Sequence, residues 1–156
     1  MTRTTADLDR LSARLLHLMS FVPEEKLTWA PSSTARSPLT IAAHCALVNR
    51  FFASIITDTM PETMPTPQEF FDGLREGAGK IASREEAVAL LEETTVELTS
   101  AVSGVHAGTI EALRRSPFGP IPVQFWIEQG PGHLAGHIGQ VEYLQTIWGD
   151  LDDHFN

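Results

Sequence analysis

Apolar residues recur at the spacing of an α-helix in four long segments of this chain, and no other feature limits its fold as strongly. In the first segment, from about Ala6 to Phe21, apolar side chains return every three or four residues, at Leu8, Leu11, Leu15, Leu18, Met19 and Val22. No segment shows the strict polar–apolar alternation that is typical of a half-buried strand. The sequence therefore predicts an all-α fold in which each helix buries one face.

The second segment has a clear start. Ser37 is a suitable N-cap residue and Pro38 fits the first helical position, so we expect a helix from Pro38 to about Asp58. Ala46 is expected to point away from the inward face of this helix. That face should carry Ile41, His44, Val48, Phe51 and Ile55.

The third and fourth helices also carry boundary signals. Ser83 and Glu86 fit a capping box that opens the third helix. The expected inward stripe of that helix is Val88, Leu91, Thr95, Leu98 and Val102. The fourth helix covers roughly Pro122 to Trp148 and contains Gly130-Pro131-Gly132. Because proline lacks the amide hydrogen that a helix needs, we expect a kink or a fresh start there.

Residues 59–82 separate the second and third helices and contain three prolines and three glycines. A short helix from about Gln68 to Arg75 fits within them. A connection of this length lets the two flanking helices run in the same direction rather than as a tight hairpin. We therefore predict a four-helix bundle with a long crossover between helices two and three, formed as a single domain over residues 1–156.

The chain is strongly acidic, with 20 Asp and Glu residues against 11 Lys and Arg residues and a net charge of −9. This charge repels phosphate backbones and anionic lipid surfaces, so we expect neither a nucleic acid nor a membrane as partner. Cys45 is the one cysteine, which rules out an internal disulfide. No apolar run approaches the roughly 18 residues that span a bilayer, and residues 2–14 lack the apolar centre of an export signal. These features predict a cytoplasmic protein.

The six histidines fall into two groups according to the helix face on which each lies. On the fourth helix, His133 and His137 are four residues apart and share one face with the apolar residues. On the second helix, His44 lies in the middle of the inward face. The others are expected on the surface of the first helix, in a loop and in the C-terminal tail: His17, His106 and His154. The sequence thus places three histidines in one apolar interior.

Buried imidazoles are costly unless their ring nitrogens find partners, by about 1–3 kcal/mol for each unsatisfied group. A divalent metal ion accepts a lone pair from each neutral ring, and two histidines four residues apart on a helix suit its geometry. Alternatively, the same three residues are core histidines bonded to backbone carbonyls and water. Spacing and orientation leave both interpretations open.

Three residues near the histidine pair are candidates for the surroundings of a site. Gln140, one turn after the pair, could orient bound water or substrate. Gln129 and Trp126, one or two turns before the pair, could line a pocket. Trp126 is also explained as an ordinary core residue.

Four short segments stand out in order along the chain: Val22–Pro31 (VPEEKLTWAP), Ser37–His44 (SPLTIAAH), Phe118–Pro122 (FGPIP) and Gly132–Leu144 (GHLAGHIGQVEYL). They resemble the first interhelical loop, the start of the second helix, the turn before the fourth helix and the His-x-x-x-His-x-Gly-Gln segment of the DinB/YfiT-like superfamily. The resemblance implies a four-helix bundle with a long crossover, often a homodimer, in which His44, His133 and His137 bind one divalent metal ion.

Three neutral protein ligands leave coordination positions open, as in catalytic rather than structural metal sites. We expect Zn or Ni, with Fe, Co or Mn as further candidates, because imidazole accepts all of these ions. Relatives of this kind, by resemblance, include transferases that use a low-molecular-weight thiol and maleylpyruvate isomerases that need one. The leading hypothesis is a metal-dependent enzyme that transfers such a thiol to an electrophilic small-molecule substrate. A non-catalytic metal- or ligand-binding bundle and a metal-dependent hydrolase are the alternatives.

Overall fold

The structure, a computed structural model that describes residues 2–155, confirms the all-α prediction. Five α-helices and two short 3-10 helices account for most of the chain, and two strands of two residues each pair in the connection before the last helix. The helices are α1 (Thr2–Phe21), α2 (Pro38–Ile56), α3 (Pro67–Gly79), α4 (Arg84–Ser103) and α5 (Val123–Ile147). The small elements are η1 (Glu24–Lys26), η2 (Ala107–Thr109), β1 (Leu113–Arg114) and β2 (Ile121–Pro122). Residues 1 and 156 of the predicted domain lie outside the described part.

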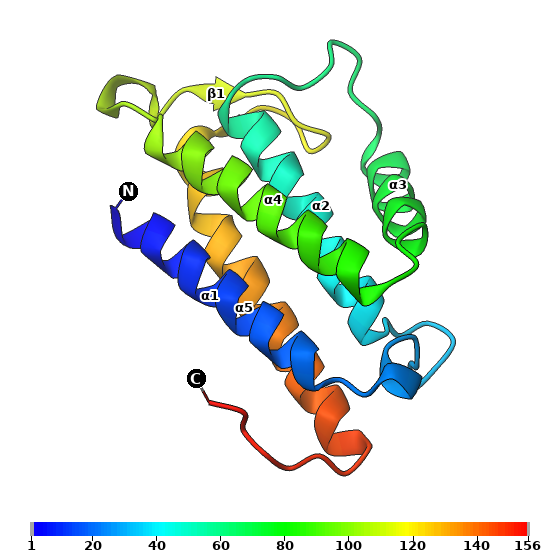
Figure 1. Cartoon of the computed structure of the whole chain (residues 1–156). Coiled ribbons are helices and arrows are strands. Elements are labelled where there is room, and N and C mark those ends of the chain that lie inside the picture. The colour runs from blue at the N-terminus through cyan, green and yellow to red at the C-terminus, as the bar shows by residue number, and fades with distance from the viewer. Residues whose placement is uncertain (1, 156) are drawn as a thin grey trace.

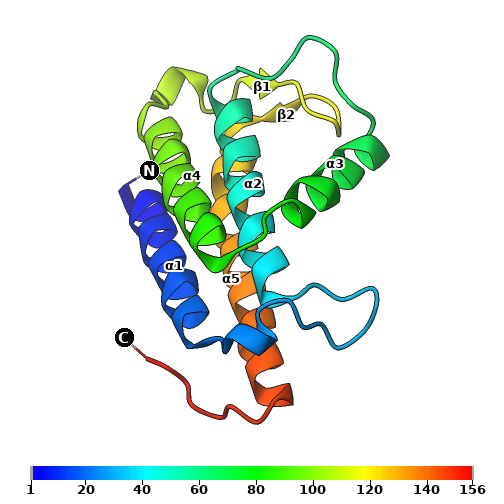
Figure 2. The same ribbon diagram turned by 45° about the vertical axis from the view of Figure 1, so that its right-hand side comes forward.

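Helices α1, α2, α4 and α5 form the predicted bundle around one apolar core (Figures 1 and 2). Helices α2 and α4 lie side by side and run in the same direction, whereas α1 and α5 run the opposite way. The connection between α2 and α4 carries α3, which packs on the outside of α2. The crossover between the second and third long helices is therefore confirmed.

Polar caps fix the starts of the helices. The Ser37 hydroxyl accepts a hydrogen bond from the Thr40 amide at 3.3 Å, and the Thr40 hydroxyl accepts one from the Ser37 amide at 2.8 Å. At α4, the Ser83 hydroxyl caps the Glu86 amide as predicted, but the Glu86 carboxylate accepts from the amide of Ala82 rather than from that of Ser83. The predicted capping box at α4 is therefore altered: the Glu86 carboxylate bonds to the amide one residue before the N-cap instead of to the N-cap amide itself.

Two helix boundaries differ from the prediction. Helix α1 begins at Thr2 instead of about Ala6. Helix α3 extends over Pro67–Gly79 and is longer than the expected Gln68–Arg75. The glycines of α3 do not interrupt this helix. At Gly77 the absence of a side chain allows α3 to lie close to α2, since a Cβ there would lie 3.0 Å from Leu47 Cδ1.

Helix α5 is one continuous helix through Pro131, so of the predicted kink or fresh start the fresh start does not occur. Proline has a backbone angle that a helix accepts, and its cost is mainly one lost hydrogen bond and local crowding. Gly130, directly before the proline, lies close to two leucine side chains: a Cβ at this position would lie 3.0 Å from Leu8 Cδ2 and 3.4 Å from Leu98 Cδ2. Helix α5 packs mainly against α1 and α2.

Helix α2 is buried on more sides than its predicted stripe. Ala46, which was expected to point outward, has no exposed surface, because α3, α4 and α5 all pack against this helix. The helix has a mean hydropathy of 1.5 and is long enough to cross a membrane by length and composition, but 78% of it is buried inside the bundle. That burial is typical of the central helix of a folded core.

Candidate metal centre

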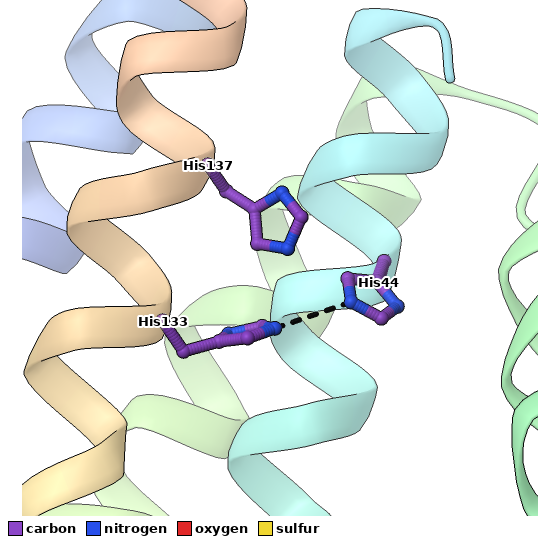
Figure 3. Close-up of side chains that lie close together, drawn as sticks. All are labelled: His44, His133 and His137. Atoms are coloured by element: carbon purple, nitrogen blue, oxygen red, sulfur yellow. Dashed lines mark hydrogen bonds between the residues drawn. The ribbon is translucent and has the colours of Figure 1, made fainter. Parts of the chain in front are cut away.

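The three inward histidines meet between α2 and α5. Figure 3 shows His44 on α2 facing His133 and His137, which project from successive turns of α5. One ring nitrogen from each lies within 4.8 Å of the others. His44 and His137 are buried, and His133 is half-buried. The bundle therefore brings together three imidazoles that can hold one metal ion.

The hydrogen bonds of the rings indicate which nitrogens face the centre. The His133 Nε2 and His44 Nε2 atoms are 3.1 Å apart. The His137 Nδ1–H donates to Gln140 Oε1 at 2.8 Å, which leaves the Nε2 lone pair of His137 free for the cluster. The His133 Nδ1 atom is buried and has no hydrogen-bond partner among the described residues.

Burial keeps the three rings uncharged. Burial lowers the pKa of His44 to about 3, and the charge of Arg36 and the neighbouring His137 add to this effect. Burial, followed by the two other histidines and Arg36, lowers the pKa of His133 to about 3. The pKa of His137 is also lowered by burial, against the opposing effect of its bond to Gln140. Three neutral imidazoles with converging lone pairs match the donor set that Zn and similar divalent ions accept.

The metal-free protein is expected to lose stability as the pH falls below about 6.5. Unfolded imidazoles titrate near pH 6.5, whereas His44 and His133 have pKa values of about 3 in the folded chain. The unfolded chain therefore binds more protons between these values, so stability is full above pH 6.5 and is lost as the pH falls through this window. His133→Gln removes one such group. Between about pH 7 and about pH 4.5, the melting temperature of this variant should therefore fall less than that of the wild type.

Thermal denaturation of the metal-free proteins at both pH values measures this difference. His106→Gln is the control, because His106 is exposed in the described structure and lies outside the histidine cluster. Equal falls for wild type and His133→Gln would contradict the expected burial of a neutral ring.

The three other predicted site residues have different surroundings in the structure. Gln140 lies at the cluster as the hydrogen-bond partner of His137. Trp126 is 3% exposed and lines a cavity that also reaches His133. Gln129 is exposed and lines none of the cavities described below.

The remaining histidines lie outside the cluster. His17, expected on the surface, is half-buried, and its ring packs edge-on against Phe21 with centroids 4.9 Å apart. The ring of His154 also stacks on Phe21, with centroids 4.1 Å apart. The C-terminal segment thus returns onto α1 beside His17, a contact that helical periodicity cannot predict.

Two cavities border the histidine cluster, with volumes of about 310 Å³ and about 670 Å³. Both are lined by Arg36, His44 and Leu74. Arg36 was not among the site residues predicted from the sequence. Its position directly before the Ser37 N-cap could have indicated that it lies near His44, because that cap places Arg36 at the same end of α2.

The smaller cavity has mostly aromatic walls that sequence analysis also missed. They come from α2, α3, α5 and the turn between the two strands: Phe51, Phe52, Phe70, Phe71, Phe118 and Trp126. No local pattern in the sequence links these segments, because they meet only after the bundle and the crossover have folded.

Comparison with known proteins shows which family this chain matches. The family model described as the DinB superfamily matches residues 7–141. The chain is similar to a conserved protein from Enterococcus faecalis, with a TM-score of 0.75, 15% identity, and coverage of 94% of this chain and 95% of that one. It is similar to a DinB-like protein from Bacillus subtilis, with a TM-score of 0.69, 11% identity, and coverage of 96% and 94%.

A third solved structure is a mycothiol-dependent maleylpyruvate isomerase. It has a TM-score of 0.68 and 10% identity to this chain, with coverage of 90% of this chain and 60% of the isomerase. None of the curated proteins matches the chain. At these identities the likeness to solved structures establishes the fold.

Proposed function

Because the chain belongs to the DinB superfamily, we propose that it is a metal-dependent enzyme in which His44, His133 and His137 hold one divalent ion, and that it transfers a low-molecular-weight thiol to an electrophilic small molecule. The observation that carries this proposal is the convergence of three neutral imidazoles within 4.8 Å beside two cavities. Zn and Ni are the favoured ions.

The cluster has the character of a reactive site. When bound, a divalent ion with three neutral ligands supplies a lowered pKa to a coordinated thiol or water, which yields a nucleophile near neutral pH. The protein holds the three rings in place: Gln140 fixes the ring of His137, and the apolar walls of the smaller cavity exclude water. The mycothiol dependence of one structural relative supports a thiol as co-substrate.

The proposed reaction is a substitution at carbon. The thiol loses its proton to solvent, the sulfur forms a bond to the electrophilic carbon, and the leaving group departs with the electron pair of its bond. The larger cavity has room for the thiol, and its walls include hydrogen-bonding side chains from Thr34, Thr40 and Gln140.

A thiol screen tests this activity. Zn- or Ni-loaded protein is incubated with chlorodinitrobenzene and with cysteine, glutathione, bacillithiol or mycothiol in turn, and the S-conjugate is quantified by mass spectrometry. We expect conjugation with at least one thiol to exceed that of metal-free protein. Consumption of ester or amide substrates without added thiol would instead indicate the hydrolase. Metal binding without turnover in either assay would indicate a non-catalytic binding bundle.

Gln140→Ala is expected to lower metal affinity about 10- to 100-fold, because the ring of His137 then loses the partner that fixes its tautomer and orientation. Gln140→Glu keeps an acceptor oxygen and should retain affinity close to wild type. Gln129→Ala is the matched control, since Gln129 lies exposed on the same helix. Competition with a chromophoric chelator measures all four proteins, and equal affinity in Gln140→Ala and wild type would argue against this role.

Three further predictions belong to the proposal. We expect the chain to act as a single domain over residues 1–156, in the cytoplasm and as a homodimer. Its acidic net charge supports the expectation of no nucleic-acid partner. Light scattering on purified protein measures the oligomeric state, and a monomer mass at working concentration would contradict the dimer.

A further inference from the structure

The smaller cavity beside the histidine cluster has an unusual combination of walls. Six aromatic and two aliphatic side chains face it together with the three histidines and one arginine. Its volume of about 310 Å³ is at the lower end of the range for small-molecule sites. These walls suit a small ligand with a flat apolar body, because aromatic rings gain by stacking with such a group beyond the burial of its surface.

Arg36 is the one permanently charged side chain among the residues that line this cavity. Arg36 is the exposed residue directly before the Ser37 cap. It lines both the smaller and the larger cavity, so it lies at the common rim of the two. Within residues 2–155 it forms neither a salt bridge nor a hydrogen bond, whereas Arg50, Arg75 and Arg84 are each paired with carboxylates. Its charge also reaches the cluster, since after burial it contributes to the lowered pKa of each of the three histidines.

We propose that the aromatic cavity binds a small monocarboxylic acid, with its apolar or aromatic body against Phe70, Phe118 and Trp126 and its carboxylate on Arg36. One guanidinium matches one carboxylate through paired hydrogen bonds. A cationic ligand is disfavoured by Arg36, and a polyanion would find no second cation on these walls.

This arrangement deepens the proposed function, and only the assignment of the acid as thiol acceptor rests on that function. His133 and His137 line the same cavity, so an acid bound there lies beside the histidine cluster. The electrophilic substrate would then be an acid whose reactive carbon lies between its carboxylate and its apolar body. The larger cavity, which His44 also lines, stays available for the thiol.

Calorimetric titration with unreactive probes tests the site separately from catalysis. Hydrocinnamate, its neutral amide and phenyl phosphate are titrated into metal-free and Zn-loaded protein. Hydrocinnamate should bind both forms about tenfold or more tightly than the amide, because only the carboxylate forms charge-assisted hydrogen bonds with the guanidinium. Tighter binding of phenyl phosphate would overturn the choice of a carboxylate.

Substitutions identify the residue that binds the anion. Arg36→Gln should weaken hydrocinnamate about tenfold or more and leave the amide unchanged, with an unchanged melting temperature because Arg36 has no internal partner. Arg75→Gln is the matched control, since Arg75 lines only the larger of the two cavities. Phe118→Ala should weaken acid and amide alike.

The outcomes separate this inference from the proposed function. Binding that survives Arg36→Gln but disappears on metal removal would mean that the metal holds the carboxylate, and would overturn the role of Arg36. No binding of hydrocinnamate to either form would overturn the acid site, while the thiol screen would still decide the transferase activity. Acid binding in a protein that fails the thiol screen would retain the site and remove its assignment to the acceptor.

Discussion

Protein with His133→Ala and His137→Ala is expected to contain no bound metal, whereas wild-type protein purified without a tag or chelator should contain about one equivalent per chain. The two substitutions remove both ligands on α5 and leave only His44 on α2, which cannot hold an ion alone. Metal content by plasma mass spectrometry, together with the binding of added Zn or Ni, gives the result directly.

The matched control for this experiment is His17→Ala with His106→Ala. It removes the same number of imidazoles, but neither residue belongs to the cluster. It should therefore retain the metal. Circular dichroism verifies that each protein is helical, and His133→Gln with His137→Gln provides a second variant of closer size. Wild-type protein that contains no metal and binds neither added ion would leave the three residues as core histidines.

Leu98→Ala is expected to lower the free energy of unfolding by about 2–5 kcal/mol. Leu98 is 1% exposed on α4, and its Cδ2 atom lies close to Gly130 of α5. The truncated side chain leaves a cavity that the neighbouring helices cannot fill without moving α5. Urea denaturation followed by circular dichroism measures the change.

Val96→Ala on the same helix is the control for Leu98→Ala. Val96 is 65% exposed, so its truncation should alter the free energy of unfolding by no more than about 0.5 kcal/mol. A change below about 1 kcal/mol for Leu98→Ala would contradict the close packing of Leu98 in the core.

The helices of the bundle were largely predictable because their signals are local. The Ser37 cap and Pro38 define the start of α2, and the stripe through Leu91 and Leu98 defines the buried face of α4. The errors occurred where tertiary contacts overrule the local preference. Ala46 is buried rather than exposed, since α3, α4 and α5 all pack against α2.

Periodicity alone determined that His44, His133 and His137 face the interior, because the side chain direction in a helix follows from position. It could not bring α2 and α5 together at the height where these rings meet, nor give His137 its partner Gln140. Packing of the whole bundle decided both.

The ligand side of the site depends even more on tertiary structure. Phe70 reaches the cavity from the crossover, Phe118 from the turn between the strands and Arg36 from the residue before α2. Sequence determined the helices and the direction of the histidines, since both depend on neighbours within a few residues. Only the folded chain decided which charge and which aromatic walls surround them, because those contacts join segments that no local rule connects.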